Sequence, residues 1–212
     1  MRFRAKQFLA GVSIPCCVFV AAVLLSAMPK HAAPQDVNGE LTLKVDGSQS
    51  SVHWMLATTL HNIHGTFSAK GGTLRVDVPT GKVQGEIVVL ATSGDSGNGA
   101  RDRRMHREVL ESERFPDVVF QPDRIQGRLA ASGASDLQLH GKFLLHGSEH
   151  ELTVPVHTEL SGDHWSGNTK FCVPFLDWGL KDPSNFLLKV KHEVEIELEL
   201  RGTLEGSPSA KP

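Results

Sequence analysis

Residues 186–200 read FLLKVKHEVEIELEL, and this stretch decides the fold class. Its even positions are almost all apolar, whereas the odd positions from 189 to 199 are all Lys or Glu. A period of two gives a β-strand one apolar face and one polar face. A helix would need apolar residues every three or four positions, and this pattern would spread them around the helix axis. The stretch therefore predicts a strand from Phe186 to Leu200.

The same alternation recurs along most of the chain. The apolar positions of these runs are Val52, Trp54 and Leu56; Leu74, Val76 and Val78; Ile87 and Val89; Val118 and Phe120; Leu137, Leu139, Phe143 and Leu145; Leu152, Val154 and Val156; and Trp165, Phe171, Val173 and Phe175. Turn residues separate the runs, as at Gly71-Gly72, Pro79-Thr80-Gly81 and Ser161-Gly162-Asp163. Gly141 indicates a bend or bulge, and Pro155 weakens the ladder of its own strand. About eight or nine strands with this spacing predict a β-sandwich or a closed barrel.

One segment of the chain does not alternate. From Asp102 to Ser112 the apolar residues fit a short amphipathic helix. The helix should end before Pro116, because a proline disfavours the helical conformation in the residue that precedes it. Residues 92–100 predict a flexible loop that leads into the helix, and residues 206–212 predict a disordered tail.

Residues 1–33 have the pattern of a secretory signal peptide. Three basic residues precede a stretch from Phe8 to Leu25 that carries no charge, and small residues follow it. An uncleaved membrane anchor is the alternative, but Pro15 interrupts an apolar stretch of about 18 residues, which is at the lower limit for a span. We expect cleavage after Ala27 or Ala33, a periplasmic or secreted protein, and no stable membrane insertion after cleavage.

The charge bears on the kind of partner, and the cysteine content bears on whether a disulfide can stabilise the fold. Residues 1–33 hold four basic side chains and no acidic one, so the rest of the chain has 18 basic against 24 acidic residues, a net charge of −6. This balance argues against nucleic acid as a partner, because nucleic-acid binding needs a basic face. Cys172 is the only cysteine after residue 33, so we expect no intramolecular disulfide. The oligomeric state stays open, a homodimer included.

Five groups of motifs resemble the YceI-like family of periplasmic lipid- and polyisoprenoid-binding proteins. They are, in chain order, Val45-Asp46 with Ser51-Val52-His53-Trp54; His64-Gly65-Thr66-Phe67 with Gly72-Thr73-Leu74; Asn98-Gly99-Ala100-Arg101-Asp102 with Phe115-Pro116 and Phe120; Leu145-His146-Gly147 with Leu152-Thr153-Val154-Pro155-Val156; and Trp178-Gly179-Leu180. Each motif alone is weak, but their order across residues 41–201 is specific.

The resemblance implies an all-β fold: a single eight-stranded, antiparallel, lipocalin-like barrel with one short helix, over residues 34–205. It also implies that the lumen holds a long-chain apolar lipid, which is a polyisoprenoid, a quinone-like lipid or a fatty-acid derivative. An eight-stranded barrel is just wide enough to hold one small ligand. We therefore expect a non-catalytic binding or carrier protein without a cofactor.

The residues expected to contact the lipid occupy the apolar strand positions and the predicted helix. They are Trp54, Phe67, Leu74, Val89, Arg101, Met105, Phe120, Leu139, Phe143, Val154, Phe171 and Val194. A dry, filled core would produce the same alternation of residues. Two alternatives therefore stay open: a ligand-free, stress-linked interaction protein with a filled core, and an accessory enzyme that acts on an isoprenoid quinone.

Arginines gather on the predicted helix, where they lie near the expected mouth of the barrel: Arg101, Arg103, Arg104 and Arg107, together with Asp102. Guanidinium groups bind phosphate in a bidentate manner, and a helix N-terminus adds a weak preference for anions. This cluster predicts contact with the head group of a lipid such as a polyprenyl phosphate. The alternative is a solvated helix face, on which the arginines pair with Glu108, Glu111 and Glu113.

Other chemistry is weakly indicated. The 11 histidines match no standard zinc signature, so we expect no metal site. Ser96 lacks the Gly-x-Ser-x-Gly spacing of esterases, and Cys172 is expected to be an inert, half-buried thiol. Asp177 and Asp182 flank a turn, which accounts for at least one of them. His192 lies in the apolar register of its strand, so it is expected to be an interior histidine or a polar contact in the lumen.

Overall fold

The computed structural model describes residues 39–205. Its strands are β1 (Glu40–Val45), β2 (Ser51–Ala57), β3 (Asn62–Asp77), β4 (Lys82–Asp95), β5 (Asp117–Gln126), β6 (Gly133–Leu145), β7 (Ser148–Ser161), β8 (His164–Val173) and β9 (Val194–Glu205). A 3-10 turn, η1 (Gly47–Gln49), separates β1 from β2. The helix α1 (Gly99–Arg104) continues into a π-helical turn, η2 (Met105–Val109), between β4 and β5. The predicted signal peptide and tail lie outside the described residues and stay predictions.

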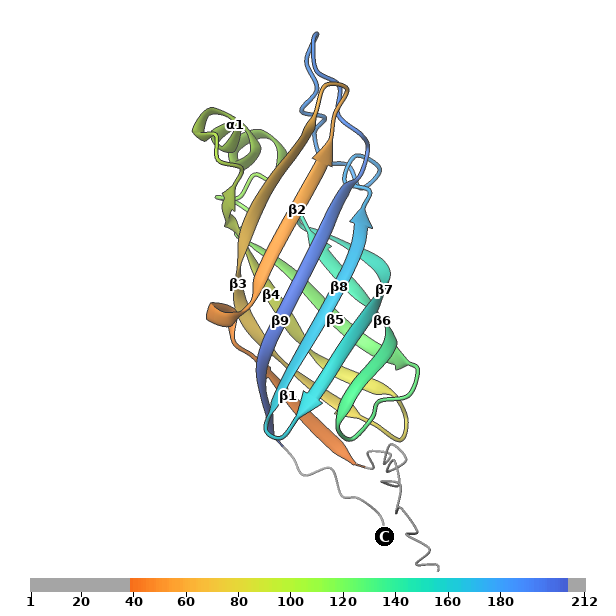
Figure 1. The fold of residues 1–212 in the computed structure, drawn as a ribbon. Coiled ribbons are helices and arrows are strands. Elements are labelled where there is room, and N and C mark those ends of the chain that lie inside the picture. The colour runs from red at the N-terminus through yellow and green to blue at the C-terminus, as the bar shows by residue number, and fades with distance from the viewer. Residues whose placement is uncertain (1–38, 206–212) are drawn as a thin grey trace, which may run out of the picture. The chain divides into compact units, whose positions relative to one another are not determined.

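The strands form one antiparallel sheet that closes on itself. Their order is β1-β3-β2-β9-β8-β7-β6-β5-β4, and β3 also pairs with β4. Strands β1 and β2 share one position in the wall, because both pair with β3 on one side and with β9 on the other. The nine strands therefore make a closed barrel of eight positions (Figure 1). The predicted eight-stranded antiparallel barrel with one short helix is confirmed.

The break between β1 and β2 has a local cause. Asp46 caps η1, since its carboxylate accepts a hydrogen bond from the backbone N–H of Ser48 at 2.9 Å. Gly47 then lies so close to β3 that a Cβ at this position would stand 2.3 Å from the carbonyl oxygen of Ala69. Only glycine lets the chain pass the neighbouring strand this closely, so the two strands continue one another across a kink.

The two ends of the barrel differ. At the closed end, short turns join β3 to β4, β5 to β6 and β7 to β8, and a buried apolar cluster that includes Leu41, Leu74, Trp165 and Leu204 packs there. At the open end lie the β2–β3 hairpin, the helical connection and a long connection from β8 to β9 (Figure 1). The closed end is therefore sealed by side chains, whereas irregular segments surround the open end.

Strand β9 begins later than the alternation predicts. The predicted strand started at Phe186, but β9 starts at Val194. Before Val194, strands β2 and β8 have ended, and the ladder continues only as a single bridge between Thr58 and Val190. Alternation alone cannot extend a strand, because its backbone groups need partners. His192, which was predicted to be interior, is exposed in this connection.

The helix begins earlier than predicted. Asn98 caps it, because its side-chain oxygen accepts hydrogen bonds from two backbone N–H groups of the first turn. The helical segment therefore starts at Gly99 rather than Asp102, and it ends at Val109 rather than Ser112.

Two predicted interruptions of strands are also wrong. The pair Gly71-Gly72 does not end a strand: β3 runs through it, and a register shift with Gly71 at φ +121° takes up the irregularity. Residues 92–95 are not part of a flexible loop, because they extend β4. Near Gly141 the ladder does shift by one residue, but the extra residue lies in β5 opposite it.

Candidate ligand cavity in the barrel

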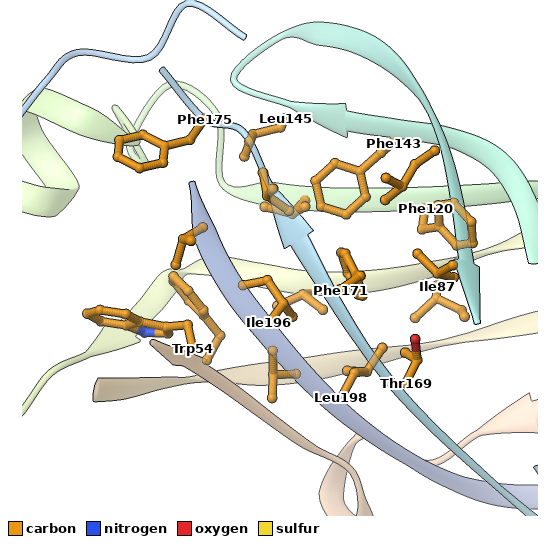
Figure 2. Close-up of a pocket in the computed structure, with 18 of the residues that line it drawn as sticks. Trp54, Ile87, Phe120, Phe143, Leu145, Thr169, Phe171, Phe175, Ile196 and Leu198 are labelled. Atoms are coloured by element: carbon orange, nitrogen blue, oxygen red, sulfur yellow. The ribbon is translucent and has the colours of Figure 1, made fainter. Parts of the chain in front are cut away.

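The barrel encloses a cavity of about 610 Å³ (Figure 2). All nine strands contribute to its wall, and they do so at alternate positions, such as Ile196, Leu198 and Leu200 of β9. Binding sites for small molecules usually measure about 300–1,000 Å³. The interior is therefore not a filled core, and its size suits an organic ligand.

The twelve residues predicted to contact a ligand all lie on the wall of this cavity. Ten come from β2 to β9, and Arg101 and Met105 come from the helical connection at the open end. The period of two assigned the inward face correctly in each of these strands. That these side chains contact a ligand stays a prediction.

Three phenylalanines line the cavity toward its open end. The ring of Phe143 lies 6.4 Å from that of Phe120 and 6.3 Å from that of Phe171, between centroids. All three point inward but are only half-buried, so their exposed surface faces the cavity (Figure 2). Burial of apolar surface yields about 25 cal/mol per Å². This aromatic surface is therefore available to an apolar ligand.

Two polar atoms on the wall have no partner within the described residues. They are the indole Nε1 of Trp54, which is 6% exposed, and the hydroxyl of Thr169. A buried polar group without a partner costs about 1–3 kcal/mol. Both atoms are covered by neighbouring protein atoms, so the fold itself carries this cost.

The charged residues of the described wall are two arginines at the open end, Arg101 and Arg104. The Arg101 guanidinium donates hydrogen bonds to the hydroxyl and the carbonyl oxygen of Ser96, at 2.7 and 2.8 Å. The Ser96 hydroxyl in turn donates to Asp102. Arg101 is thus held in place before any ligand arrives. Positive charge at the mouth of an apolar cavity favours a ligand with an anionic head and an apolar tail.

The other predicted members of the arginine cluster do not reach the cavity. Arg103 and Arg107 are exposed, and Arg107 pairs with Glu108 at 2.9 Å. Glu108 also contacts Arg104 at 3.6 Å and Lys181 at 3.0 Å, and the hydrogen bonds from Arg107 and Lys181 lower the pKa of Glu108 to about 2. The predicted pairing of the helix arginines with Glu108 is therefore confirmed for Arg104 and Arg107, whereas contact of Arg101 and Arg104 with a head group stays a prediction.

Sequence reasoning missed the residues that the loops bring to the open end. His61 from the β2–β3 hairpin and Asn185 and Leu188 from the β8–β9 connection all line the cavity there. Phe175, which was predicted to lie in a strand, follows the end of β8 and packs with Leu180 over the cavity. The turn signals of this segment, a proline and a glycine, were the available evidence that it leaves the wall.

A ring stack lies beside the part of β7 that does not pair with β8. Strand β7 pairs with β8 only over His157–Ser161, and Pro155, which lacks an N–H donor, lies just outside that ladder. In the part of β7 that lacks this pairing, the His150 ring stacks on Trp178, with centroids 4.0 Å apart and planes 3° apart. Burial lowers the pKa of His150, so the neutral imidazole is favoured in the folded protein.

The stack should make the stability of the barrel depend on pH. Because the pKa of His150 is lowered in the folded state, the unfolded chain takes up a proton first as the pH falls below about 6.5. The free energy of unfolding should therefore decrease as the pH falls below about 6.5, and this part of the decrease should be absent from His150→Phe, which keeps a ring on Trp178. Urea unfolding of both proteins across this pH range measures it. Parallel pH profiles of the two proteins would contradict the assignment.

Other reactive groups do not converge. Among residues 39–205, no group of three or more His, Cys, Asp or Glu side chains is arranged to hold a metal ion. Cys172 is exposed rather than half-buried, and desolvation with nearby Glu193 and Glu195 raises the pKa of its thiol. A raised pKa keeps the thiol protonated and thus poorly nucleophilic. In the same part of the chain, no helix is long and apolar enough to cross a membrane.

Solved structures share this architecture. BcnA of Burkholderia cenocepacia superposes with a TM-score of 0.62 at 18% identity, over 75% of this chain and 99% of BcnA. A domain of Saccharophagus degradans, described as polyisoprenoid binding and implicated in plant cell wall breakdown, gives 0.59 at 12% identity, over 77% and 98%. These likenesses show the fold alone. No curated protein matches the sequence.

The family model for the YceI-like domain matches residues 43–202. This range runs from β1 to β9 and contains the whole cavity wall described above. The match therefore covers the barrel rather than an isolated motif. The chain belongs to the YceI-like domain family.

Proposed function

We propose that the protein is a non-catalytic carrier that binds one long-chain apolar lipid of the isoprenoid type in the barrel. The observation that carries the proposal is the cavity of about 610 Å³, whose described wall is apolar except for a few groups, chiefly at its open end. Such a site gains its affinity from the burial of apolar surface. It therefore suits a long hydrocarbon tail.

The printed description of one relative supports the class of lipid. The Saccharophagus degradans domain with the same fold is described as polyisoprenoid binding. An isoprenoid tail is flexible and branched, and it can follow a curved aromatic wall such as that around Phe143. The wall also holds polar side chains, His61 and Asn185 among them, that suit an oxygen on the lipid. We therefore include quinone-like lipids in the proposal.

A carrier role is favoured over an enzymatic one. A catalyst would need a nucleophile or an acid–base pair within hydrogen-bonding reach of one another in the cavity. The polar groups on the described wall are two arginines at the mouth and dispersed His, Asn and Thr side chains. We propose that the protein works in the periplasm or after secretion, which is where the predicted signal peptide would send it.

The test of the proposed function is to identify what the protein holds. Protein purified from its own host without detergent is extracted with organic solvent, and the extract is examined by mass spectrometry. An isoprenoid lipid recovered near one molecule per chain is the expected result. A protein that is empty when purified, and that also fails to take up added polyprenol, would refute the proposal.

The two arginines at the mouth should select for a phosphorylated head group. Replacing both, Arg101→Ala and Arg104→Ala, should weaken the binding of a polyprenyl phosphate by about tenfold or more, since a charge-assisted hydrogen bond contributes about 1.5–3 kcal/mol. Affinity for the corresponding neutral polyprenol should change little. Titration of both ligands against both proteins measures the difference.

The matched control for this prediction lies on the same helix. Arg103→Ala with Arg107→Ala removes the same charge from side chains that do not line the cavity. This control should keep the affinity for the phosphate. If both double variants lose equal affinity, the effect is one of overall charge and the mouth does not recognise the head group.

A further inference from the structure

Three large apolar side chains are exposed at the open end of the barrel. Leu60 is 71% exposed, Phe186 is 95% exposed and Leu187 is 78% exposed. They are the exposed large hydrophobic residues of the part of the chain that the structure describes. Leu60 lies at the tip of the β2–β3 hairpin, and the other two lie in the β8–β9 connection. Isolated exposed leucines are common, but three at neighbouring loop tips form a feature that needs an explanation.

The two loops are bound to each other. The backbone N–H of Thr59 donates to the carbonyl oxygen of Lys189 at 3.0 Å, and that of Lys191 donates to Ala57 at 2.9 Å. Figure 1 shows both loops, orange and blue, extending together beyond the strands. The loop tips are therefore one connected structure rather than two independent segments.

Each tip is also held in its own turn. The side chain of Asn185 accepts hydrogen bonds from the backbone N–H groups of Leu187 and Leu188, at 2.9 and 2.8 Å. The hydroxyl of Thr58 accepts from the N–H groups of Leu60 and His61. These bonds fix the backbone so that the apolar side chains point outward.

The exposed side chains adjoin the entrance of the cavity. His61 follows Leu60 and lines the cavity, and Leu188 follows Leu187 and lines it too. Asn185, which precedes Phe186, also lies on the wall. Any surface that covers the three apolar side chains therefore lies against the mouth.

Lysines lie beside the apolar tips. Residues 57–62 and 181–193 hold Lys181, Lys189 and Lys191, all exposed, against Asp182 and Glu193, a formal net charge of +1. The chain as a whole has a formal net charge of −2. A small positive excess on a protein of negative net charge, beside apolar side chains, suits adsorption to anionic lipid.

We propose that these residues, Leu60, Phe186, Leu187, Lys189 and Lys191, form a rim that docks the mouth of the barrel on an anionic lipid bilayer. The apolar side chains enter the head-group region, and the lysines lie at its surface. A protein partner fits less well: three side chains supply on the order of 500 Å² at most, whereas a stable interface takes about 800 Å² per partner. Docking does not depend on the proposed carrier function. Only the passage of a lipid between the bilayer and the cavity rests on that function.

The test uses the full chain as its host processes it, with vesicles of phosphatidylcholine alone or mixed with phosphatidylglycerol. The protein should float with the mixed vesicles and much less with phosphatidylcholine. The triple variant Leu60→Ser, Phe186→Ser and Leu187→Ser should lose at least about tenfold in vesicle affinity. Its thermal unfolding should be unchanged, because all three side chains are exposed. Vesicle binding equal to that of the original protein would overturn the proposal.

A second readout identifies which end touches the lipid. In Phe186→Trp, lipids brominated near the head group should quench the added fluorescence, whereas Asp163→Trp, in the closed-end β7–β8 turn, should show no added quenching. Because β1 begins at the closed end, attachment through the chain's N-terminal segment would favour quenching at Asp163→Trp and would overturn the proposal. The proposal would also be overturned if the protein associated with itself but not with vesicles, and if the triple variant lost this self-association.

The docking test and the test of the proposed function can fail separately. If the triple variant loses vesicle binding but still takes up polyprenol from a detergent-free dispersion, docking and cavity binding are both supported as distinct properties. If the protein binds no polyprenol yet depends on the rim for vesicle binding, the carrier proposal fails and docking stands.

Discussion

Two tryptophans placed inside the barrel, by Leu139→Trp and Ile196→Trp together, should abolish lipid binding. Both side chains line the cavity, and β6 and β9 are three positions apart in a closed sheet of eight, so the new rings meet from nearly opposite sides. The added volume replaces the space that a tail would occupy. Bound lipid should fall by at least about tenfold, equivalent to ~1.4 kcal/mol of binding free energy.

The alternation of the strands supplies the matched control. Gln138 directly precedes Leu139, and Glu197 directly follows Ile196. Both are exposed on the outer face of the barrel. The variant Gln138→Trp with Glu197→Trp therefore adds the same two rings outside the barrel, where lipid binding should persist. Solvent extraction and mass spectrometry of both proteins measure the difference.

Stability decides whether the cavity variant is informative. Overpacking a filled core costs about 1–3 kcal/mol, but these rings enter space that is open, so the cost should be smaller. A cooperative thermal transition close to that of the original protein is expected. If the cavity variant folds and still holds a lipid at the original ratio, then the lipid lies elsewhere and the carrier proposal is wrong.

The inward face of the barrel could be predicted from the sequence because it is a local property. Side chains of a strand alternate between faces whatever the strand pairs with, so Trp54, Phe143 and Val194 could all be placed on one surface. The twelve predicted residues lie on the cavity wall for this reason. Alternation could not tell a filled lumen from an open one, since that depends on how the closed wall compares in size with the side chains inside it.

The open end could not be predicted because its structure depends on distant partners. Phe186 continues the alternation of β9 perfectly, yet it is 95% exposed, since no neighbouring strand extends that far. The cap of α1 is a different case, because Asn98 is a local signal that the sequence does contain. Reading that signal would have placed the helix at Gly99. It would not have shown that Arg101 faces the cavity, which depends on the path of the chain around Ser96.

Replacing Gly202 with alanine should destabilise the barrel by about 3 kcal/mol or more, which places it among severe single substitutions. A Cβ at this position would stand 1.7 Å from the carbonyl oxygen of Lys44, the closest such approach among the glycines of residues 39–205. Gly202 pairs with Val45 of β1 and with Trp165 of β8, so neither side of the strand can yield freely. For a domain of this size the midpoint of thermal unfolding should fall by about 10 °C.

The cost is large because one methyl group disturbs two interactions at once. The Nε1 of Trp165 donates to the same Lys44 oxygen at 3.1 Å, and it would lie 2.9 Å from the new carbon. Moving either group breaks that bond and leaves a buried donor unpaired, which costs about 1–3 kcal/mol. Gly99→Ala is the control, because its Cβ would meet nothing closer than 3.5 Å, and the change should be neutral or stabilise the helix by up to about 1 kcal/mol. Surface substitutions usually change the free energy of unfolding by less than about 0.5 kcal/mol. If Gly202→Ala changes it by no more than that, then β1 does not pack against β9 at this position. The closed end would then not be sealed by Leu41 and Leu204.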